Sequence, residues 1–286
     1  MESIWITEMT FKPTGPLTFR RMPSGSLPIM SYPFMPPTTM SGFLQRLLII
    51  AEGAQGEDGG EWPGYGEDWF GTGAKGKEKP PGKEFTLTLG KEFRTLGAYP
   101  QPNQWKIHKT RRHGPKNFQH AQFSQILRED HKENYQLHHW DYLFCDNLKG
   151  WVAARESRDL DRLRCLKNFG GKAGKEGYLY VAAIDPPREL FLQDGDFRPA
   201  GLAPAFFSPS SGTYYSLYGH HWSDEYLWKN GQKGGVDGFF QVGAWWNVSR
   251  LRGAYWALEA GFGFPAVVPD LFLKGDVEPF YHEGQP

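Results

Sequence analysis

The chain has almost no cysteine, because Cys145 and Cys165 are the two among its 286 residues. They do not form a C-x-x-C motif, and two such residues cannot supply the disulfide framework of a small secreted domain. The sequence also lacks the run of about 18 apolar residues that a membrane-spanning helix requires. Its first residues, MESIWITEMTF, lack the basic and long apolar regions of a signal peptide. These absences predict a cytoplasmic protein with no membrane partner.

Net charge is absent as well, because 32 basic and 32 acidic residues balance. A neutral chain is not expected to coat nucleic acid non-specifically. One stretch departs from this balance, since residues 93–128 contain no Asp and no Glu. Local positive charge of this kind attracts polyanions, so we expect one face of the protein to contact nucleic acid. The stretch carries seven cations, Arg94, Lys106, Lys109, Arg111, Arg112, Lys116 and Arg128, together with His108, His113 and His120.

Aromatic residues are abundant, at 16% of the chain with 11 Trp, and hydrophobic residues make up 39%. This composition indicates a globular protein, and the length fits one elaborate domain or two small ones. Trp and Tyr serve both in cores and as stacking surfaces. Their number alone therefore does not distinguish packing from base binding.

A strand and a helix are predicted near the start of the chain. Residues 3–11 alternate and are rich in Ile, Trp, Thr and Phe, which is typical of a strand. Apolar residues then recur at helical spacing in residues 40–51, and Thr38 or Thr39 is the expected N-cap. The unpaired N–H groups at this helix start suit a phosphate, although an ordinary capped core helix explains the pattern as well.

A projecting hairpin is predicted within the basic stretch, after a Gly-rich loop at 53–82 and a strand at 85–89. Residues 105–109 alternate apolar with basic side chains, which suits one arm of a hairpin, and residues 111–115 would form its tip. Residues 118–133 are expected to be partly helical. The further elements predicted are strands at 142–144, 150–154, 238–242 and 245–248, a buried strand at 177–184, a charged helix at 159–166, and an internal boundary at residues 185–187.

Three features of the sequence recur together in a known family. The first is P-P-T-T-x-S-G-F-L-x-R-L-L at residues 36–48, the second is the basic segment, and the third is N-F-G-G-K-A-G-K-E-G-Y-L-Y-V at residues 168–181. In this order they resemble the RAMP superfamily of CRISPR-associated proteins, and more narrowly CRISPR-associated protein family 5. The third element departs from the family's Leu-Gly-basic pattern, because Phe169-Gly170-Gly171-Lys172 stands in its place.

This resemblance implies an α+β fold. Residues 1–185 would form a ferredoxin-like, RRM-like RAMP domain, with the Gly-rich loop 53–82 and a protruding β-hairpin thumb at about 93–128. Residues 186–286, which carry no motif of the family, would form an aromatic-rich β extension packed on that domain.

The resemblance also implies a function and partners. The chain would be the subunit that caps the 5′ handle of the crRNA in a type I Cascade complex, with type I-D as the nearest subtype. Its protein partners would be a backbone RAMP subunit and the large subunit of Cascade. It would also help to engage target double-stranded DNA near the PAM. No cofactor and no metal is expected.

The candidate RNA-binding residues are mainly cations, which would bind phosphates of a bent single strand. Trp105 is the expected stacking residue, and the exposed N–H groups of the Gly-rich turn at residues 170–177 suit phosphate. A solvated basic face, a flexible turn and a core Trp are the simpler alternatives. The candidates are Arg20, Arg21, Trp105, Lys106, His108, Lys109, Arg111, Arg112, Lys116, Lys167, Lys172 and Lys175.

Two other functions remain open from the sequence. His108, His113 and Lys109 are residue types that support metal-independent cleavage of RNA, because such cleavage needs a base for the 2′-OH proton and groups that stabilise the phosphorane. The chain would then process pre-crRNA as an endoribonuclease. Histidines in a basic hairpin need no catalytic role, however, and we expect no catalytic residue. An aromatic-rich binding protein unrelated to CRISPR is the third alternative.

Overall fold

The computed structural model describes residues 3–21, 29–53, 93–115, 135–220 and 239–268. Several predicted features lie outside these residues. They are the loop at 53–82 beyond Gly53, the strand at 85–89, the partly helical segment at 118–133, and Lys116. No helix among the described residues is long and apolar enough to cross a membrane.

The main sheet has the strand order of a ferredoxin-like fold. Its strands run β9–β1–β7–β4, and each neighbouring pair is antiparallel. The elements follow along the chain as strand, helix, strand, strand, helix, strand, which is the split βαβ arrangement. The predicted α+β class and ferredoxin-like domain are therefore confirmed. The elements are β1 (Ile4–Pro13), α1 (Pro37–Gly53), β4 (Phe93–Pro100), β7 (Leu148–Ala154), α3 (Ser157–Asp161) with the 3-10 helix η3 (Arg162–Leu166), and β9 (Tyr178–Ile184).

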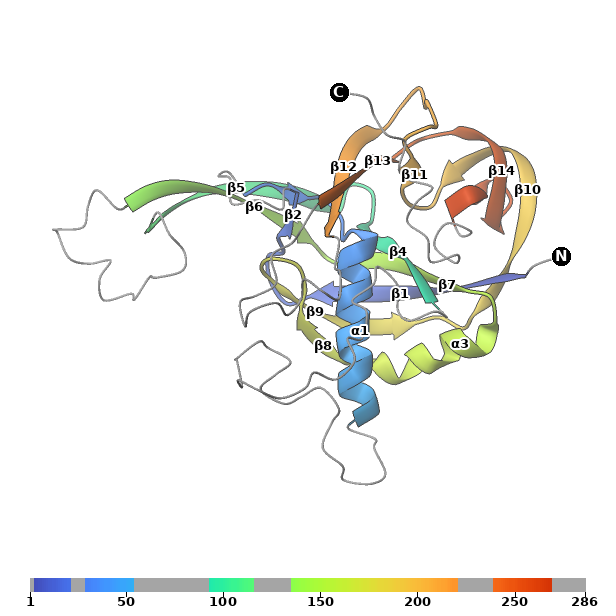
Figure 1. The fold of residues 1–286 in the computed structure, drawn as a ribbon, viewed down its shortest axis with the longest axis horizontal. Helices are drawn as coiled ribbons and strands as arrows, with labels where there is room; N and C mark the ends of the chain where they lie inside the picture. Colours follow the sequence, from blue (N-terminus) through green and yellow to red (C-terminus); the bar gives the residue numbers. More distant parts are fainter. Residues whose placement is uncertain (1–2, 22–28, 54–92, 116–134, 221–238, 269–286) are drawn as a thin grey trace.

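Helix α1 covers one face of this sheet (Figure 1). The apolar residues predicted to form its inner face are buried, including Met40, Leu44 and Leu47. The helix begins at Pro37, and the Met40 N–H donates to the Pro36 carbonyl at 2.9 Å. The predicted N-cap at Thr38 or Thr39 is wrong, because both residues lie inside the helix. Proline suits the first helical position, because its φ is preset and it lacks the N–H that would be left unpaired there.

A β-hairpin is inserted between β4 and β7. Its strands are β5 (Trp105–Pro115) and β6 (Tyr135–Cys145), and Figure 1 shows them projecting away from the main sheet. The predicted protruding hairpin is confirmed with two corrections. β4 pairs with β7 in the main sheet, so the hairpin begins at Trp105 and not at residue 93. Residues 111–115 pair with residues 135–139, so they belong to a strand and do not form the tip.

The later strands extend the main sheet and add a second one. β10 pairs with the start of β1, where Ile4 lies opposite Leu190, so the sheet continues past the predicted boundary at 185–187. The strands predicted at 238–242 and 245–248 are one strand, β13, which ends before Asn247 at a positive φ of 57°. The strands of this region are β10 (Arg188–Pro199), β11 (Ala203–Pro204), β12 (Thr213–His220), β13 (Phe239–Trp246), β14 (Leu251–Glu259) and β15 (Phe262–Pro265).

An aromatic cluster joins these later strands to the ferredoxin-like domain. The ring of Phe34 lies between 5.2 and 5.5 Å, centroid to centroid, from the rings of Tyr32, Tyr99, Tyr215 and Trp246. Aromatic pairs at such separations stabilise a core beyond their buried area. The cluster explains part of the high aromatic content as packing.

Candidate nucleic-acid interface

The acid-free stretch divides between the core and the surface. Arg94 lies on β4 and is 3% exposed, and its guanidinium donates to the Phe93 carbonyl at 2.8 Å. Burial, with a smaller contribution from Arg155, lowers the pKa of Arg94. This cation therefore does not belong to a surface patch.

Within the described residues, the exposed cations of the acid-free stretch lie on the hairpin. Lys106, His108, Lys109 and Arg111 are all exposed on β5. In the strand register Lys106 lies opposite Phe144 and His108 opposite Tyr142, so these side chains share one face of the hairpin. Lys109 and Arg111 occupy the alternate positions and face the other side. Cations thus line both faces of the hairpin.

The other predicted hairpin residues have different placements. Arg112 is opposite His138 in the backbone register, and Lys116 lies outside the described residues. Trp105 is half-buried and its ring packs 5.4 Å from that of Trp246, against the main core. Its surroundings are those of the core-packing alternative and not those of a stacking platform.

The segment at residues 17–21 holds the base of the hairpin. Leu17 and Leu143 exchange two backbone hydrogen bonds, of 2.7 and 3.0 Å. The Trp140 indole Nε1 donates to the Thr18 hydroxyl at 3.0 Å, and that hydroxyl donates to the Asp141 carbonyl at 2.9 Å. Because Thr18 is fully buried, these bonds satisfy polar groups that have no water.

The Gly/Lys loop, residues 172–177, lies against the same segment. The Thr18 N–H donates to the Glu176 carbonyl and the Lys175 N–H to the Thr18 carbonyl, both at 2.8 Å. The Tyr142 hydroxyl on β6 donates to the Glu176 carboxylate at 2.9 Å. The loop, the segment at 17–21 and the hairpin base therefore form one hydrogen-bonded unit.

Two glycines permit this close approach. Gly174 and Gly177 have φ values of +70° and +109°. A Cβ atom would lie 2.7 Å from the Thr18 carbonyl oxygen at Gly174, and 2.6 Å from the Pro16 carbonyl oxygen at Gly177. The loop is thus a fitted element and not a freely flexible turn.

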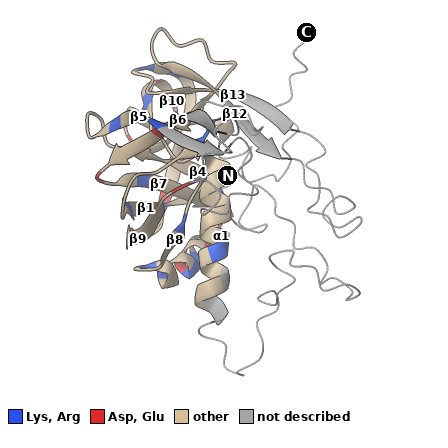
Figure 2. Ribbon diagram, turned by 90° about the vertical axis from the view of Figure 1, so that its left-hand side faces the viewer, with Lys and Arg blue, Asp and Glu red and all other residues tan. Residues whose placement is uncertain are grey.

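The cations of this loop are available to solvent. Lys172 is exposed at the end of β8 (Gly170–Lys172), and Lys175 is exposed within the loop. Lys167 is exposed where η3 ends, at the opposite end of β8. Figure 2 shows Lys and Arg residues, in blue, on several elements, among them β5 and the region of β8.

The two arginines after the first strand face aromatic rings and protein. Arg20 is half-buried on β2 (Phe19–Arg20), which pairs with β3 (Ser31–Tyr32), and burial lowers its pKa. The Arg21 guanidinium carbon lies 5.1 Å from the centroid of the Tyr215 ring and 5.9 Å from that of Tyr32. These are cation–π distances, so Arg21 joins this segment to β12.

One exposed aromatic side chain on β9 was not predicted. Residues 177–184 were expected to form a buried strand, but Leu179 and Val181 are buried whereas Tyr178 is 58% exposed. Tyr178 lies opposite Lys172 in the register of β8 and β9. The alternation in Y-L-Y-V was the available signal, because alternate residues of a strand face opposite sides.

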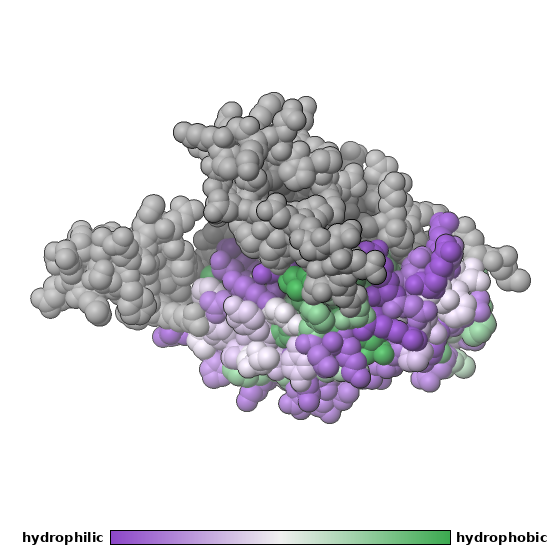
Figure 3. All heavy atoms as spheres, turned by 90° about the horizontal axis from the view of Figure 1, so that it is seen from below, coloured by the Kyte–Doolittle hydropathy of each residue, from purple (hydrophilic) through white to green (hydrophobic). Residues whose placement is uncertain are grey.

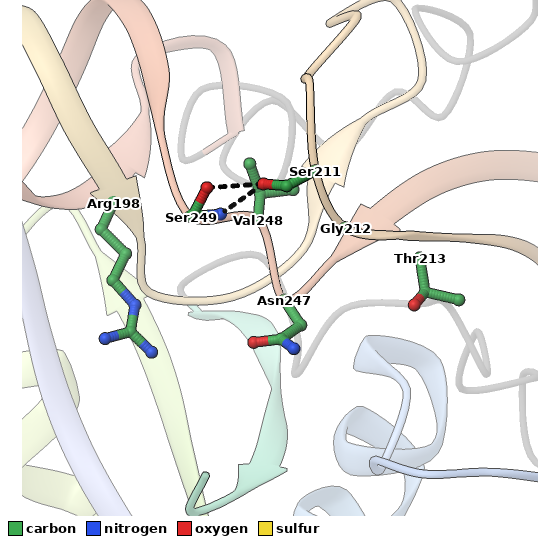
Figure 4. Close-up of a pocket in the computed structure, with 7 residues that line it drawn as sticks. All are labelled: Arg198, Ser211, Gly212, Thr213, Asn247, Val248 and Ser249. Atoms are coloured by element: carbon green, nitrogen blue, oxygen red, sulfur yellow. Dashed lines mark hydrogen bonds between the residues drawn. The ribbon is translucent and has the colours of Figure 1, made fainter.

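An open pocket of about 460 Å³ lies apart from the hairpin, beside the connection between β13 and β14 (Figure 4). The Ser211 and Ser249 hydroxyl oxygens are 2.6 Å apart within it. The lining offers hydroxyl, amide and guanidinium groups to a polar ligand. It consists of Arg198, Ser211, Gly212, Thr213, Asn247, Val248 and Ser249.

The described surface offers no metal site. Among the described residues, no group of three or more His, Cys, Asp or Glu side chains is placed to hold a metal ion. The face seen from below is mostly hydrophilic where it is described, with smaller hydrophobic areas (Figure 3). The chemistry on offer is therefore that of cations, exposed rings and backbone N–H groups.

Comparison with known proteins gives no family assignment. No family model matches the chain, and no curated protein matches it. Among solved structures, the chain is similar to a CRISPR protein from Archaeoglobus fulgidus, with 13% identity and a TM-score of 0.36 over 85% of this chain and 86% of that one. It is also similar to a chain of the Type III-B Cmr-beta structure bound to cognate target RNA and AMPPnP, with 11% identity and a TM-score of 0.44 over 86% of each chain.

Both TM-scores are too low to carry an argument about this chain. The class of the protein is therefore taken from its own strand order. It is an α+β protein with a ferredoxin-like sheet, an inserted cationic hairpin and an aromatic-rich set of later strands.

Proposed function

We propose that the chain is a non-catalytic RNA-binding subunit of a CRISPR effector complex. The observation that carries the proposal is the hydrogen-bonded unit formed by the hairpin base, residues 17–21 and the Gly/Lys loop. It connects the cations of two sequence-distant elements through one set of hydrogen bonds. A bent single strand of RNA needs such fixed cations, because its phosphates follow no regular groove.

The more specific role is capping of the 5′ handle of a crRNA in a type I Cascade complex. The support for this role is the resemblance of residues 36–48 and 168–181 to CRISPR-associated protein family 5. In that role a backbone RAMP subunit and the large subunit are the protein partners. In that role the chain would also help to engage target double-stranded DNA near the PAM.

The proposal can be tested on the hairpin. The variant carrying Lys106→Ala, Lys109→Ala and Arg111→Ala removes exposed cations from β5. Binding of a single-stranded repeat RNA is measured by fluorescence anisotropy over a series of salt concentrations. Each lost phosphate contact reduces the slope of log K against log salt by about 0.7 for a single strand. We therefore expect weaker binding and a slope smaller by up to about 2.

The matched control removes three exposed arginines elsewhere, by Arg158→Ala, Arg188→Ala and Arg252→Ala. This variant lowers the net charge by the same amount, and it should retain the wild-type slope. Equal slopes for the hairpin variant and the wild type would show that the hairpin does not contact RNA. Circular dichroism of each variant verifies that the fold is kept.

A further inference from the structure

The strands β8 and β9 turn one face away from helix α1. A Cβ atom on Gly171 would lie 3.8 Å from Leu47 and 3.9 Å from Phe43 of α1, so Gly171 faces the helix. Its partner in the register, Leu179, is buried. Lys172 and Tyr178 form the next pair along the two strands, so they face the opposite side.

Tyr178 exposes its ring on a fixed backbone. The side chain is 58% exposed. The Tyr178 carbonyl accepts hydrogen bonds from the Thr14 N–H at 2.9 Å and from the Thr14 hydroxyl at 3.2 Å. The strand is also paired with β1 and β8. An aromatic ring held in solvent on a rigid strand loses little conformational freedom when a flat ligand stacks on it.

Two lysines lie on the strands that flank this ring. Lys172 is its cross-strand neighbour, and Lys12 on β1 lies opposite Tyr180, which shares the face of Tyr178. Both lysines are exposed. The nearby Glu176 carboxylate accepts a hydrogen bond from the Tyr142 hydroxyl of the hairpin. The ring therefore lies between positive charges, close to the base of the hairpin.

We infer that Tyr178 is a base-stacking platform for single-stranded RNA, with Lys172 and Lys12 on the flanking phosphates. This inference rests on the proposed RNA-binding function. It gives the stacking role to Tyr178 in place of Trp105, the residue that the sequence alone suggests. An exposed ring flanked by cations on an open sheet face is how RRM-type sheets hold unpaired bases. Stacking tolerates any base, because every base has a π-face.

The test uses the full chain and a twelve-nucleotide single-stranded RNA of mixed sequence that carries 2-aminopurine at successive positions. Stacking on the ring quenches the fluorescence of the base it contacts, and anisotropy gives the affinity. We expect Tyr178→Ala to bind roughly 5- to 150-fold more weakly, which is the usual effect of losing one stacked base. Tyr178→Phe keeps the ring and should stay within about twofold of the wild type.

Phe191→Ala is the matched control, because Phe191 is an exposed ring, at 64%, beyond the opposite end of β1. It should leave affinity and quenching unchanged. Normal RNA binding by Tyr178→Ala, with quenching at the same position as in the wild type, would overturn the inference and leave the proposed function standing. No RNA binding by the wild-type chain would overturn both.

Discussion

Arg94 and Arg111 belong to the same acid-free stretch, yet their surroundings differ completely. Arg94 is turned into the core of the main sheet, where its guanidinium donates to a backbone carbonyl. Arg111 is exposed on β5. Burial also separates the two aromatic residues considered for stacking, since Trp105 packs on Trp246 whereas Tyr178 is open to solvent. At the scale of residues, burial decides which side chain can meet a ligand.

Cys145 gives a test of burial at this scale. Desolvation, with a smaller contribution from Asp146, raises the pKa of Cys145 to about 12. The thiolate is the reactive form, so in a Cys165→Ser variant the rate of alkylation by iodoacetamide should still rise about tenfold per pH unit between pH 8 and 10. A rate that levels off near pH 9 in the folded protein would contradict the raised pKa.

The same shift affects stability. Because the folded pKa is raised above the unfolded value of about 8.5, the contribution of the neutral thiol is fully present below that pH. It is lost as the pH rises towards the folded pKa of about 12. The free energy of unfolding at alkaline pH should therefore fall less steeply in a Cys145→Ala variant than in the parent, as measured by urea denaturation.

At the scale of elements, close backbone contacts fix the candidate interface. The hairpin, the segment at 17–21 and the Gly/Lys loop come from distant parts of the sequence. Their arrangement depends on hydrogen bonds around Thr18 and on glycines that allow the loop to approach. The hairpin arm and the Gly/Lys loop were each predictable, because alternation and glycine clustering are local signals. Their contact was not.

Gly177→Ala tests this fit. A Cβ atom there would lie 2.6 Å from the Pro16 carbonyl oxygen, and the φ of +109° is unfavourable for a residue with a side chain. We expect the free energy of unfolding in urea to fall by about 1–3 kcal/mol, together with a lower affinity for RNA.

Gly171→Ala is the control within the same stretch. Its Cβ would meet only ordinary contacts, at 3.8 Å and beyond, so stability and affinity should stay near those of the parent. If both alanine variants behave alike, the loop does not depend on the close approach at Gly177.

At the scale of the whole molecule, the balanced charge is consistent with the proposed subunit and not with a protein that coats nucleic acid non-specifically. Exposed cations lie on the hairpin and around the Gly/Lys loop as well as on α3, β10 and β14, while the later strands pack through aromatic rings onto the ferredoxin-like domain. In the proposed complex, the other faces of the molecule would contact neighbouring subunits.

The proposed role as a subunit without catalytic activity has its own test. The full chain is incubated with repeat RNA in EDTA, and the products are resolved on a denaturing gel. We expect intact RNA, because a histidine in a cationic hairpin can serve as a contact residue, and the ring of His108 packs edge-on against that of Phe144 with the centroids 6.0 Å apart. Cleavage that is lost in a His108→Ala variant would instead establish the endoribonuclease alternative.

The sequence by itself determined the first strand, the core face of α1 and the existence of a cationic hairpin, whereas the α+β class came from the resemblance of its motifs to a family. These features depend on the local alternation of side chains, which the neighbouring residues alone specify. Only the tertiary structure decided that Arg94 is core, that residues 111–115 continue a strand, and that Tyr178 faces solvent. Burial and strand pairing depend on segments far apart in the chain, so no local pattern of residues contains them.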